Sequence, residues 1–197
     1  MDSVRTTLNS KYLLWMILAI PFVLLSNAWR TESMIYGELL HSSGELSARL
    51  LIITMAITPF RLMFPTAQWP NWLLLRRRYF GVAAFFYAVF HVLIYVVRKQ
   101  SLALIVEEGM DFSMWTGWIA LVLFTVLAIT SNDASVRALK RTWKKLHRWV
   151  YPVALLTFVH WIFVAFNFIP GLIHLLVLLF LESYRVRKQQ QMKSRAI

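Results

Sequence analysis

The sequence predicts an all-α integral membrane protein, a six-helix bundle with both termini in the cytoplasm. Three observations lead to this fold class. The 197-residue chain is 59% hydrophobic and only 15% charged, which is more apolar than an ordinary soluble domain. Six long apolar segments follow one another along the chain. The loops between them alternate between rich and poor in Lys and Arg, as the loops of a multi-pass protein do.

The six apolar segments are expected to be membrane spans, each of which needs about 20 mostly apolar residues, or about 17 with snorkelling flanks. The first is expected to be retained, because Ser26-Asn27-Ala28 is a poor signal-peptide cleavage site. The fourth is slightly short, and the sixth reaches the length only with its neighbouring residues. The segments are Tyr12–Trp29, Leu46–Met63, Tyr79–Val97, Trp115–Thr130, Trp149–Phe168 and Gly171–Leu181.

Charge sets the predicted orientation. The N-terminus, the 61–78 loop, the 131–148 loop and the C-terminal tail hold 17 of the 21 Lys and Arg residues, and the alternate loops hold six of the nine acids. Because basic loops stay in the cytoplasm, we expect both termini there. Residues 1–184 are predicted to form the membrane domain and residues 185–197 a basic cytoplasmic tail, solvated or lying on anionic lipid.

The composition also excludes several functions. The chain has no cysteine, so disulfides, thiolate metal sites and thioether-linked haem are excluded. It has no glycine-rich phosphate loop and no loop long enough for a nucleotide-binding domain. Its net charge of +12 lies in short clusters between apolar runs, which fits membrane topology better than nucleic-acid binding. Function is therefore expected inside the bundle or through a partner.

Two histidines lie inside predicted spans at matched depth. His91 in the third span and His160 in the fifth each follow the cytoplasmic end of their span by about 12–13 residues, roughly 18–20 Å of helix rise. Two imidazoles at equal height on different helices are suited to bind one haem iron from opposite faces. The alternative is that each histidine only hydrogen-bonds a neighbouring helix.

His147 is a third candidate, thirteen residues before His160 and therefore about 20 Å nearer the cytoplasm. This separation suits a second, inner redox site. On an ideal helix, however, the two side chains point about 140° apart. Pro152 between them is able to kink the helix. The alternative is an interfacial histidine in a basic loop.

Four stretches of the sequence resemble the ferric-reductase-type transmembrane domain. They are RRRYFGVAAFFYAVFH, WTGWIALVLFTVLAITS, WKKLHRWVYPVALLTFVH and HSSGELSARLLIITMAITPFR. Within that family, the length, the six spans and the lack of a soluble reductase domain resemble the haem-binding membrane subunits of periplasmic methionine-sulfoxide reductase systems. The resemblance covers nearly the whole chain.

The resemblance implies b-type haem bound by His91, His147 and His160, with one haem at the outer pair and room for a second. It implies electron transfer from the quinol pool, or from a cytoplasmic flavin reductase through bound FMN, to a periplasmic molybdopterin-type reductase. The chain would then be an electron-transfer subunit with no substrate site of its own. Relatives with two haems carry a second histidine in the third span, where this chain has Arg77.

Further polar residues have two interpretations each. Arg77 and Arg78 anchor to lipid phosphate, or hold a flavin phosphate or inner haem propionates. Arg49 snorkels to the outer interface or pairs with outer propionates. His174 packs between helices, or it bonds a propionate or replaces a ligand. His41 is expected in a loop.

Three functions stay open at this point. The first is a haem b conduit that passes electrons to a separate periplasmic reductase. The second keeps the haem but makes the chain a stand-alone transmembrane reductase of ferric iron or another metal. The third is a non-redox transporter or scaffold whose histidines carry protons or metal.

Overall fold

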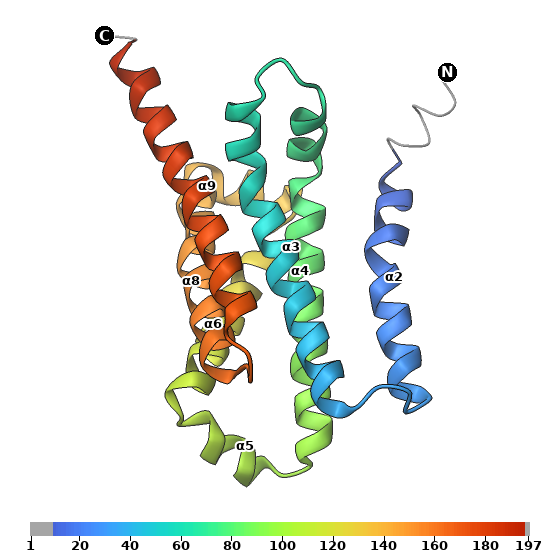
Figure 1. Ribbon diagram of the computed structural model, residues 1–197. Helices are drawn as coiled ribbons and strands as arrows, with labels where there is room; N and C mark the ends of the chain where they lie inside the picture. The colour runs from blue at the N-terminus through green and yellow to red at the C-terminus, as the bar shows by residue number, and fades with distance from the viewer. Residues whose placement is uncertain (1–9, 196–197) are drawn as a thin grey trace.

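The computed structural model describes residues 10–195, which form a bundle of helices with two shorter helices at its ends (Figure 1). Residues 1–9 and 196–197 lie outside the described residues, so the cytoplasmic placement of these residues stays a prediction. The elements are α2 (Lys11–Arg30), α3 (Tyr36–Met63), α4 (Trp69–Lys99), α5 (Leu102–Gly109), α6 (Phe112–Ile129), α7 (Asp133–Leu146), the 3-10 turn η1 (His147–Trp149), α8 (Val150–Val164) and α9 (Ile169–Ser194).

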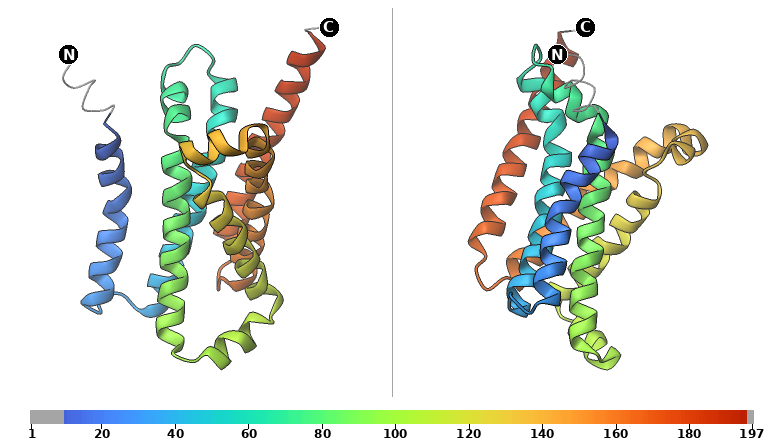
Figure 2. Two further views of the ribbon diagram at one scale, coloured as in Figure 1. Left: turned by 180° about the vertical axis from the view of Figure 1, so that it is seen from behind. Right: turned by 90° about the vertical axis from the view of Figure 1, so that its right-hand side faces the viewer.

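Two antiparallel helix pairs form the centre of the bundle. α3 packs along α4, α6 packs along α8, and α9 covers α3 and α8 (Figure 1). α2 lies beside α3 and α4 on the opposite flank (Figure 2). We call the end at which α2 begins and α9 ends the inner end, and the end that carries α5 the outer end. The long helices therefore run alternately from inner to outer end and back.

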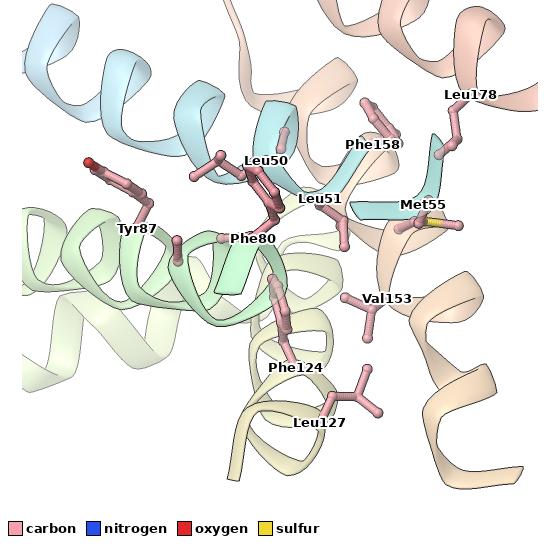
Figure 3. Close-up of a cluster of buried hydrophobic side chains, with 14 of the residues drawn as sticks. Leu50, Leu51, Met55, Phe80, Tyr87, Phe124, Leu127, Val153, Phe158 and Leu178 are labelled. Atoms are coloured by element: carbon pink, nitrogen blue, oxygen red, sulfur yellow. The ribbon is translucent and has the colours of Figure 1, made fainter. Parts of the chain in front are cut away.

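The core lies where α3, α4, α6, α8 and α9 meet. Ile57, Val153 and Phe158 have no solvent exposure, and Leu51 has 1%. Figure 3 shows side chains of these five helices converging on one cluster. The outward faces are apolar too, with many exposed large hydrophobic side chains along α2, α6 and α9. A helix that is apolar all round is typical of a membrane span, because lipid covers the face that water would otherwise meet.

Five helices, α2, α3, α4, α6 and α9, are long and apolar enough to cross a membrane. Each of the six predicted segments overlaps one helix, but the fifth was drawn too long. α8 ends at Val164 and has 15 residues, because the chain turns before α9, which begins at Ile169 and has Pro170 in its first turn. The Asn167 side chain accepts a hydrogen bond from the Ile169 amide at 3.0 Å within this turn.

Three predicted segments are shorter than the helices that contain them. α4 begins at Trp69, before the predicted start at Tyr79. α9 begins at Ile169 and continues without a break to Ser194, through the predicted domain boundary at 184/185. α3 begins at Tyr36, so His41 lies in a helix and not in a loop, which corrects the prediction for that residue. The apolar run that marked this span starts later, because the first turns of α3 are polar.

Two surface helices lie in loops that the sequence left without structure. α5 at the outer end is capped by Ser101, and α7 at the inner end by Asn132, whose side chain accepts from Ser135 N at 2.8 Å. Each is tied to α4 by an ion pair. Lys99 pairs with Glu108 of α5, and Arg78 pairs with Asp133 of α7 at 2.6 Å.

Tyr87 joins α4 to α2 through the backbone of α2. Its hydroxyl donates to the Leu18 carbonyl at 2.7 Å and accepts from the Phe22 amide at 3.0 Å. These two groups are partners of the ordinary i to i+4 ladder beside Pro21, which has no N–H to give. The side chain of Tyr87 is 1% exposed. One buried hydroxyl therefore satisfies both backbone groups at the proline.

Candidate functional site

The structure brings His91 of α4 and His160 of α8 side by side in the outer half of the bundle. Their ring centroids are 6.4 Å apart, and the ring planes are nearly perpendicular, at 84°. The two residues lie 69 positions apart in the sequence, on helices that run in the same direction. The matched depth predicted from the span starts at Tyr79 and Trp149 is thus found in the structure, although α4 itself begins at Trp69, well before the predicted start.

Each of the two rings is hydrogen-bonded through the same atom. His91 Nδ1 lies 2.9 Å from the Leu40 carbonyl of α3, and His160 Nδ1 lies 2.7 Å from the Ser113 carbonyl of α6. A carbonyl only accepts, so Nδ1 carries the proton and donates in both rings. The lone pair of each neutral imidazole is therefore on Nε2, the atom that a metal would take.

The pair fits the axial ligand set of a haem. An imidazole nitrogen lies about 2 Å from a bound transition metal, and the ring centre about 1 Å beyond it, so two imidazoles on opposite sides of one metal have centres about 6 Å apart. The observed separation of 6.4 Å agrees with that arrangement. Among residues 10–195, no group of three or more His, Asp or Glu side chains is placed to hold a bare metal ion. A haem iron needs only the two axial nitrogens from the protein.

The structure places His147 in a different setting, in the turn η1 at the inner end. Its Nε2 lies 3.1 Å from the Thr130 hydroxyl, and its ring stacks on Trp143 with centroids 3.9 Å apart. The Trp143 indole also donates to the Thr130 carbonyl at 2.9 Å. Arg77 and Arg78 of α4 lie near enough for their positive charges to act on this ring. The ring is thus held within a network of side chains.

Arg77 and Arg78 lie on adjacent faces of α4 near the inner end. Arg78 is engaged by Asp133, whereas Arg77 is half-buried and close to the charges of Glu182 and Arg185. Glu182 and Arg185 form an ion pair of 2.9 Å on α9, and Arg185 donates a hydrogen bond to the Tyr151 hydroxyl. A groove of about 450 Å³ opens beside them, lined by Tyr151, Leu179, Glu182, Ser183, Arg185, Val186 and Arg187.

The remaining candidates lie towards the outer end. Arg49 is paired with Glu45 at 2.6 Å, and its side chain is 52% exposed. His174 Nδ1 lies 2.6 Å from the Pro170 carbonyl of its own helix, and its ring centroid is 5.2 Å from that of Trp161. The His41 ring lies edge-on to the same tryptophan, with its centroid 6.2 Å from that of Trp161. Trp161 thus has a histidine of α3 and one of α9 beside it.

The hydrogen bonds from the two histidines to backbone carbonyls of α3 and α6 were not predicted from the sequence. The carbonyls of Leu40 and Ser113 have no signal of their own, since every residue carries one. Gly44, which lies against the His91 ring, was also missed, although it stands in a Ser-Ser-Gly stretch that a search for small residues beside a predicted ligand would find. Gly117 lies against the His160 ring in the same way, whereas Gly81 has only ordinary contact with Thr54.

The fold is a bundle of apolar helices in which α4 and α8 bring two histidines together. These features define a class of helical membrane protein with paired histidines in its interior. Residues 43–158 match the family described as ferric reductase like transmembrane component, and the chain belongs to that family. This confirms the resemblance on which the sequence argument relied.

Within the family the chain is similar to proteins named protein-methionine-sulfoxide reductase heme-binding subunit MsrQ. The protein of Rhizobium meliloti is 42% identical over 120 residues, which cover 59% of this chain and 53% of that protein. The protein of Xanthomonas campestris pv. campestris is 36% identical over 160 residues, or 78% of this chain and 70% of that protein. The match to the Rhizobium protein thus spans about half of its length. No solved structure matches the chain.

Proposed function

We propose that this chain is a haem b protein of the bacterial inner membrane, with six passes and both termini in the cytoplasm. The observation that carries the proposal is the pair of imidazoles, 6.4 Å apart, each with Nε2 free of the hydrogen bond that its Nδ1 makes. His91 and His160 are the proposed axial ligands. The alternation of the helices and of the basic loops supports the six passes, with α8 and the turn before it as the fifth.

A haem at this site would supply a one-electron carrier between the two faces of the membrane. The residues of the chain hold and orient the ligands: the Leu40 and Ser113 carbonyls fix the tautomer and raise the basicity of the ligating nitrogens. Arg49 and His174, in the outer half, are proposed to interact with propionates. Arg49 would have to leave Glu45 or share it, since the two form an ion pair now.

The proposed acceptor is the periplasmic catalytic subunit of a methionine-sulfoxide reductase, of the molybdopterin type. The similar proteins are named as heme-binding subunits of such a reductase, which supports this partner. The chain itself would be an electron-transfer subunit.

The proposed electron donor is the quinol pool or a cytoplasmic flavin reductase, with FMN as a bound carrier in the second case. Arg77, Arg78 and the groove beside Glu182 lie at the inner end, where either donor would arrive. A second, inner haem with His147 as ligand is the alternative to a single haem at the outer pair. The bonds of His147 to Thr130 and its stacking on Trp143 would have to open for it.

The test is a reduced-minus-oxidised absorption spectrum of the purified protein. Low-spin b-type bands are expected, and they should be lost in both His91→Ala and His160→Ala, while His41→Ala keeps them as the matched control. A wild-type protein without these bands would favour a transporter or scaffold. Haem that is oxidised rapidly by ferric chelates, but not by the purified periplasmic subunit, would favour a stand-alone metal reductase.

A further inference from the structure

Each histidine of the pair lies directly over a glycine of the neighbouring helix. A Cβ built on Gly44 of α3 would stand 3.0 Å from His91 Nδ1 and 3.1 Å from its Cε1. A Cβ built on Gly117 of α6 would stand 2.7 Å from His160 Nδ1 and 2.8 Å from its Cε1. The contacts at Gly117 are shorter than real Cβ atoms make, and those at Gly44 are tight enough that the ring would have to shift by a few tenths of an ångström. Each ring therefore lies in or against the space that a side chain would take.

The same four-residue spacing joins each glycine to the carbonyl that binds the ring. Leu40, whose carbonyl accepts from His91, is four residues before Gly44, and Ser113, whose carbonyl accepts from His160, is four residues before Gly117. Residues four apart lie one above the other on a helix face. The ring is therefore held at two points: its Nδ1–H donates to a carbonyl, and its Nδ1–Cε1 bond lies against the bare backbone of the glycine one turn further along.

Two independent clamps of this kind determine the angle between the rings. The first belongs to α3 and α4, and the second to α6 and α8, and together they set the ring planes at 84°. Because both hydrogen bonds end on helix backbone, neither ring is free to rotate without losing its bond. The crossed orientation is thus fixed by the packing of the helices.

Crossed imidazoles have a distinct electronic effect on a low-spin ferric iron. The π orbital of each imidazole is perpendicular to its ring and acts on one of the two iron d orbitals that point out of the haem plane. Parallel rings act on the same orbital and separate the pair in energy, whereas perpendicular rings act on one each and leave the pair nearly degenerate. Near-degeneracy appears in the electron paramagnetic resonance (EPR) spectrum as a highly anisotropic low-spin signal with one dominant low-field feature.

We propose that Gly44 and Gly117 are positioning residues that hold the His91 and His160 rings perpendicular to each other, so that the haem is a highly anisotropic low-spin centre. The proposal rests on the proposed function, because it requires a haem between the two rings. It adds to that function the residues that set the ring angle and the spectroscopic class of the haem. Neither glycine touches the iron; both act through the histidines.

The experiment compares glycine-to-alanine substitutions in the haem-loaded protein. Gly117→Ala is expected to lose most of the haem, and Gly44→Ala, where the contact is less short, to keep haem whose signal has changed to a rhombic one with three resolved features. A shift in midpoint potential should accompany the new signal. Gly81→Ala is the matched control within a helix, because its Cβ would meet Thr54 at an ordinary 3.6 Å, and Gly37→Ala has nothing within 4 Å. Both controls should keep the wild-type haem content, spectrum and potential.

The outcomes separate this inference from the proposed function. Wild-type protein without haem contradicts the proposed function and the inference together. Wild-type protein with low-spin haem and a rhombic signal contradicts only the inference. So does a Gly44→Ala protein whose signal and potential equal those of wild type. Far-ultraviolet circular dichroism and size-exclusion profiles check folding, and a folded Gly117→Ala protein that binds haem as Gly81→Ala does overturns the assignment.

Discussion

The histidine pair in the outer half and His147 at the inner end differ in which ring nitrogen is hydrogen-bonded, and the neighbouring residues cause this difference. At His91 and His160 the helix backbone binds Nδ1, which leaves Nε2 for a ligand. At His147 it is Nε2 that meets a hydroxyl, and the ring lies flat on Trp143. The same side chain is thus prepared for metal binding in one place and built into a side-chain network in the other.

The difference follows from the helix that faces each ring. The outer rings face glycines, and backbone carbonyls there are within reach of an imidazole. The inner ring faces Thr130 and Trp143, and Arg77 stands on α4 where a second histidine would be needed. Arginine cannot ligate iron, since its guanidinium keeps its proton and has no lone pair to give. The comparison therefore favours one haem over two.

The largest expected effect is the loss of haem in His160→Ala. Removal of one axial nitrogen leaves the iron with a single protein ligand and opens a space beside Gly117. Haem content by pyridine haemochrome assay should fall to the background of a haem-free membrane protein. His41→Ala, which changes the histidine of α3 beside Trp161, is the control. Full haem content in His160→Ala would remove the basis of the comparison.

The second effect is on stability. Tyr87→Phe leaves the Leu18 carbonyl and the Phe22 amide without their shared hydroxyl, and each unsatisfied buried group costs about 1–3 kcal/mol. We expect the midpoint of denaturant unfolding to fall while the haem bands stay unchanged. Phe86→Leu, on the adjacent position of α4, changes an aromatic without touching these bonds. Haem loss in Tyr87→Phe would mean that the outer pair depends on α2.

The third prediction tests the inner end directly. His147→Ala should keep the wild-type haem-to-protein ratio, because the structure engages this ring with Thr130 and Trp143. A moderate loss of stability, about 1 kcal/mol for the lost hydrogen bond, is expected from the same change. A ratio that falls to about half would instead identify an inner haem and restore His147 as its ligand.

The smallest expected effect concerns pH. Hydrogen bonds from Arg78 and from Lys99 hold the pKa values of Asp133 and Glu108 below their ordinary range. Lowered carboxyl pKa values stabilise the folded form above the unfolded values, about 3.9 for Asp and 4.3 for Glu, and this contribution is lost as pH falls below them. The protection factors of the α5 and α7 amides, which correct for the intrinsic pH dependence of exchange, should therefore be constant from neutral pH to about 5 and fall in more acidic solution.

Asp133→Asn and Glu108→Gln provide the matched controls for the pH series. Each should give fast exchange in its own helix at every pH, and the haem spectrum should not follow the acidic change. Haem bands that shift together with α7 exchange would show that the inner end controls the outer pair, against the separation described above.

The sequence was sufficient to predict the parts that depend on position along a helix. Counting residues from the inner ends of two spans placed His91 and His160 at one height, and the structure brings their rings together. Apolar runs located every long helix. Their ends were less predictable, because α3 begins in the polar stretch before Leu46 and α9 continues through basic residues beyond Tyr184.

Contacts between helices could not be predicted from the sequence. The stacking of His147 on Trp143 depends on the turn between α7 and α8. The hydrogen bond between His147 and Thr130 depends on how α6 ends beside that turn. The prediction of a loop at His41 was wrong because α3 begins with small and polar residues and not with an apolar run. Packing of this kind is fixed by the fold as a whole and has no local signature.

Tyr87 also implies an order of assembly during synthesis. The hydroxyl that bridges Leu18 and Phe22 belongs to a residue made 65 positions after Phe22. Until α4 has entered the bilayer, the Leu18 carbonyl and the Phe22 amide beside Pro21 lack the tyrosine hydroxyl, and lipid offers no hydrogen-bonding group in its place. α2 is thus the first helix to be made, but it takes its final place only after α4 has been inserted, when the tyrosine is there to receive it.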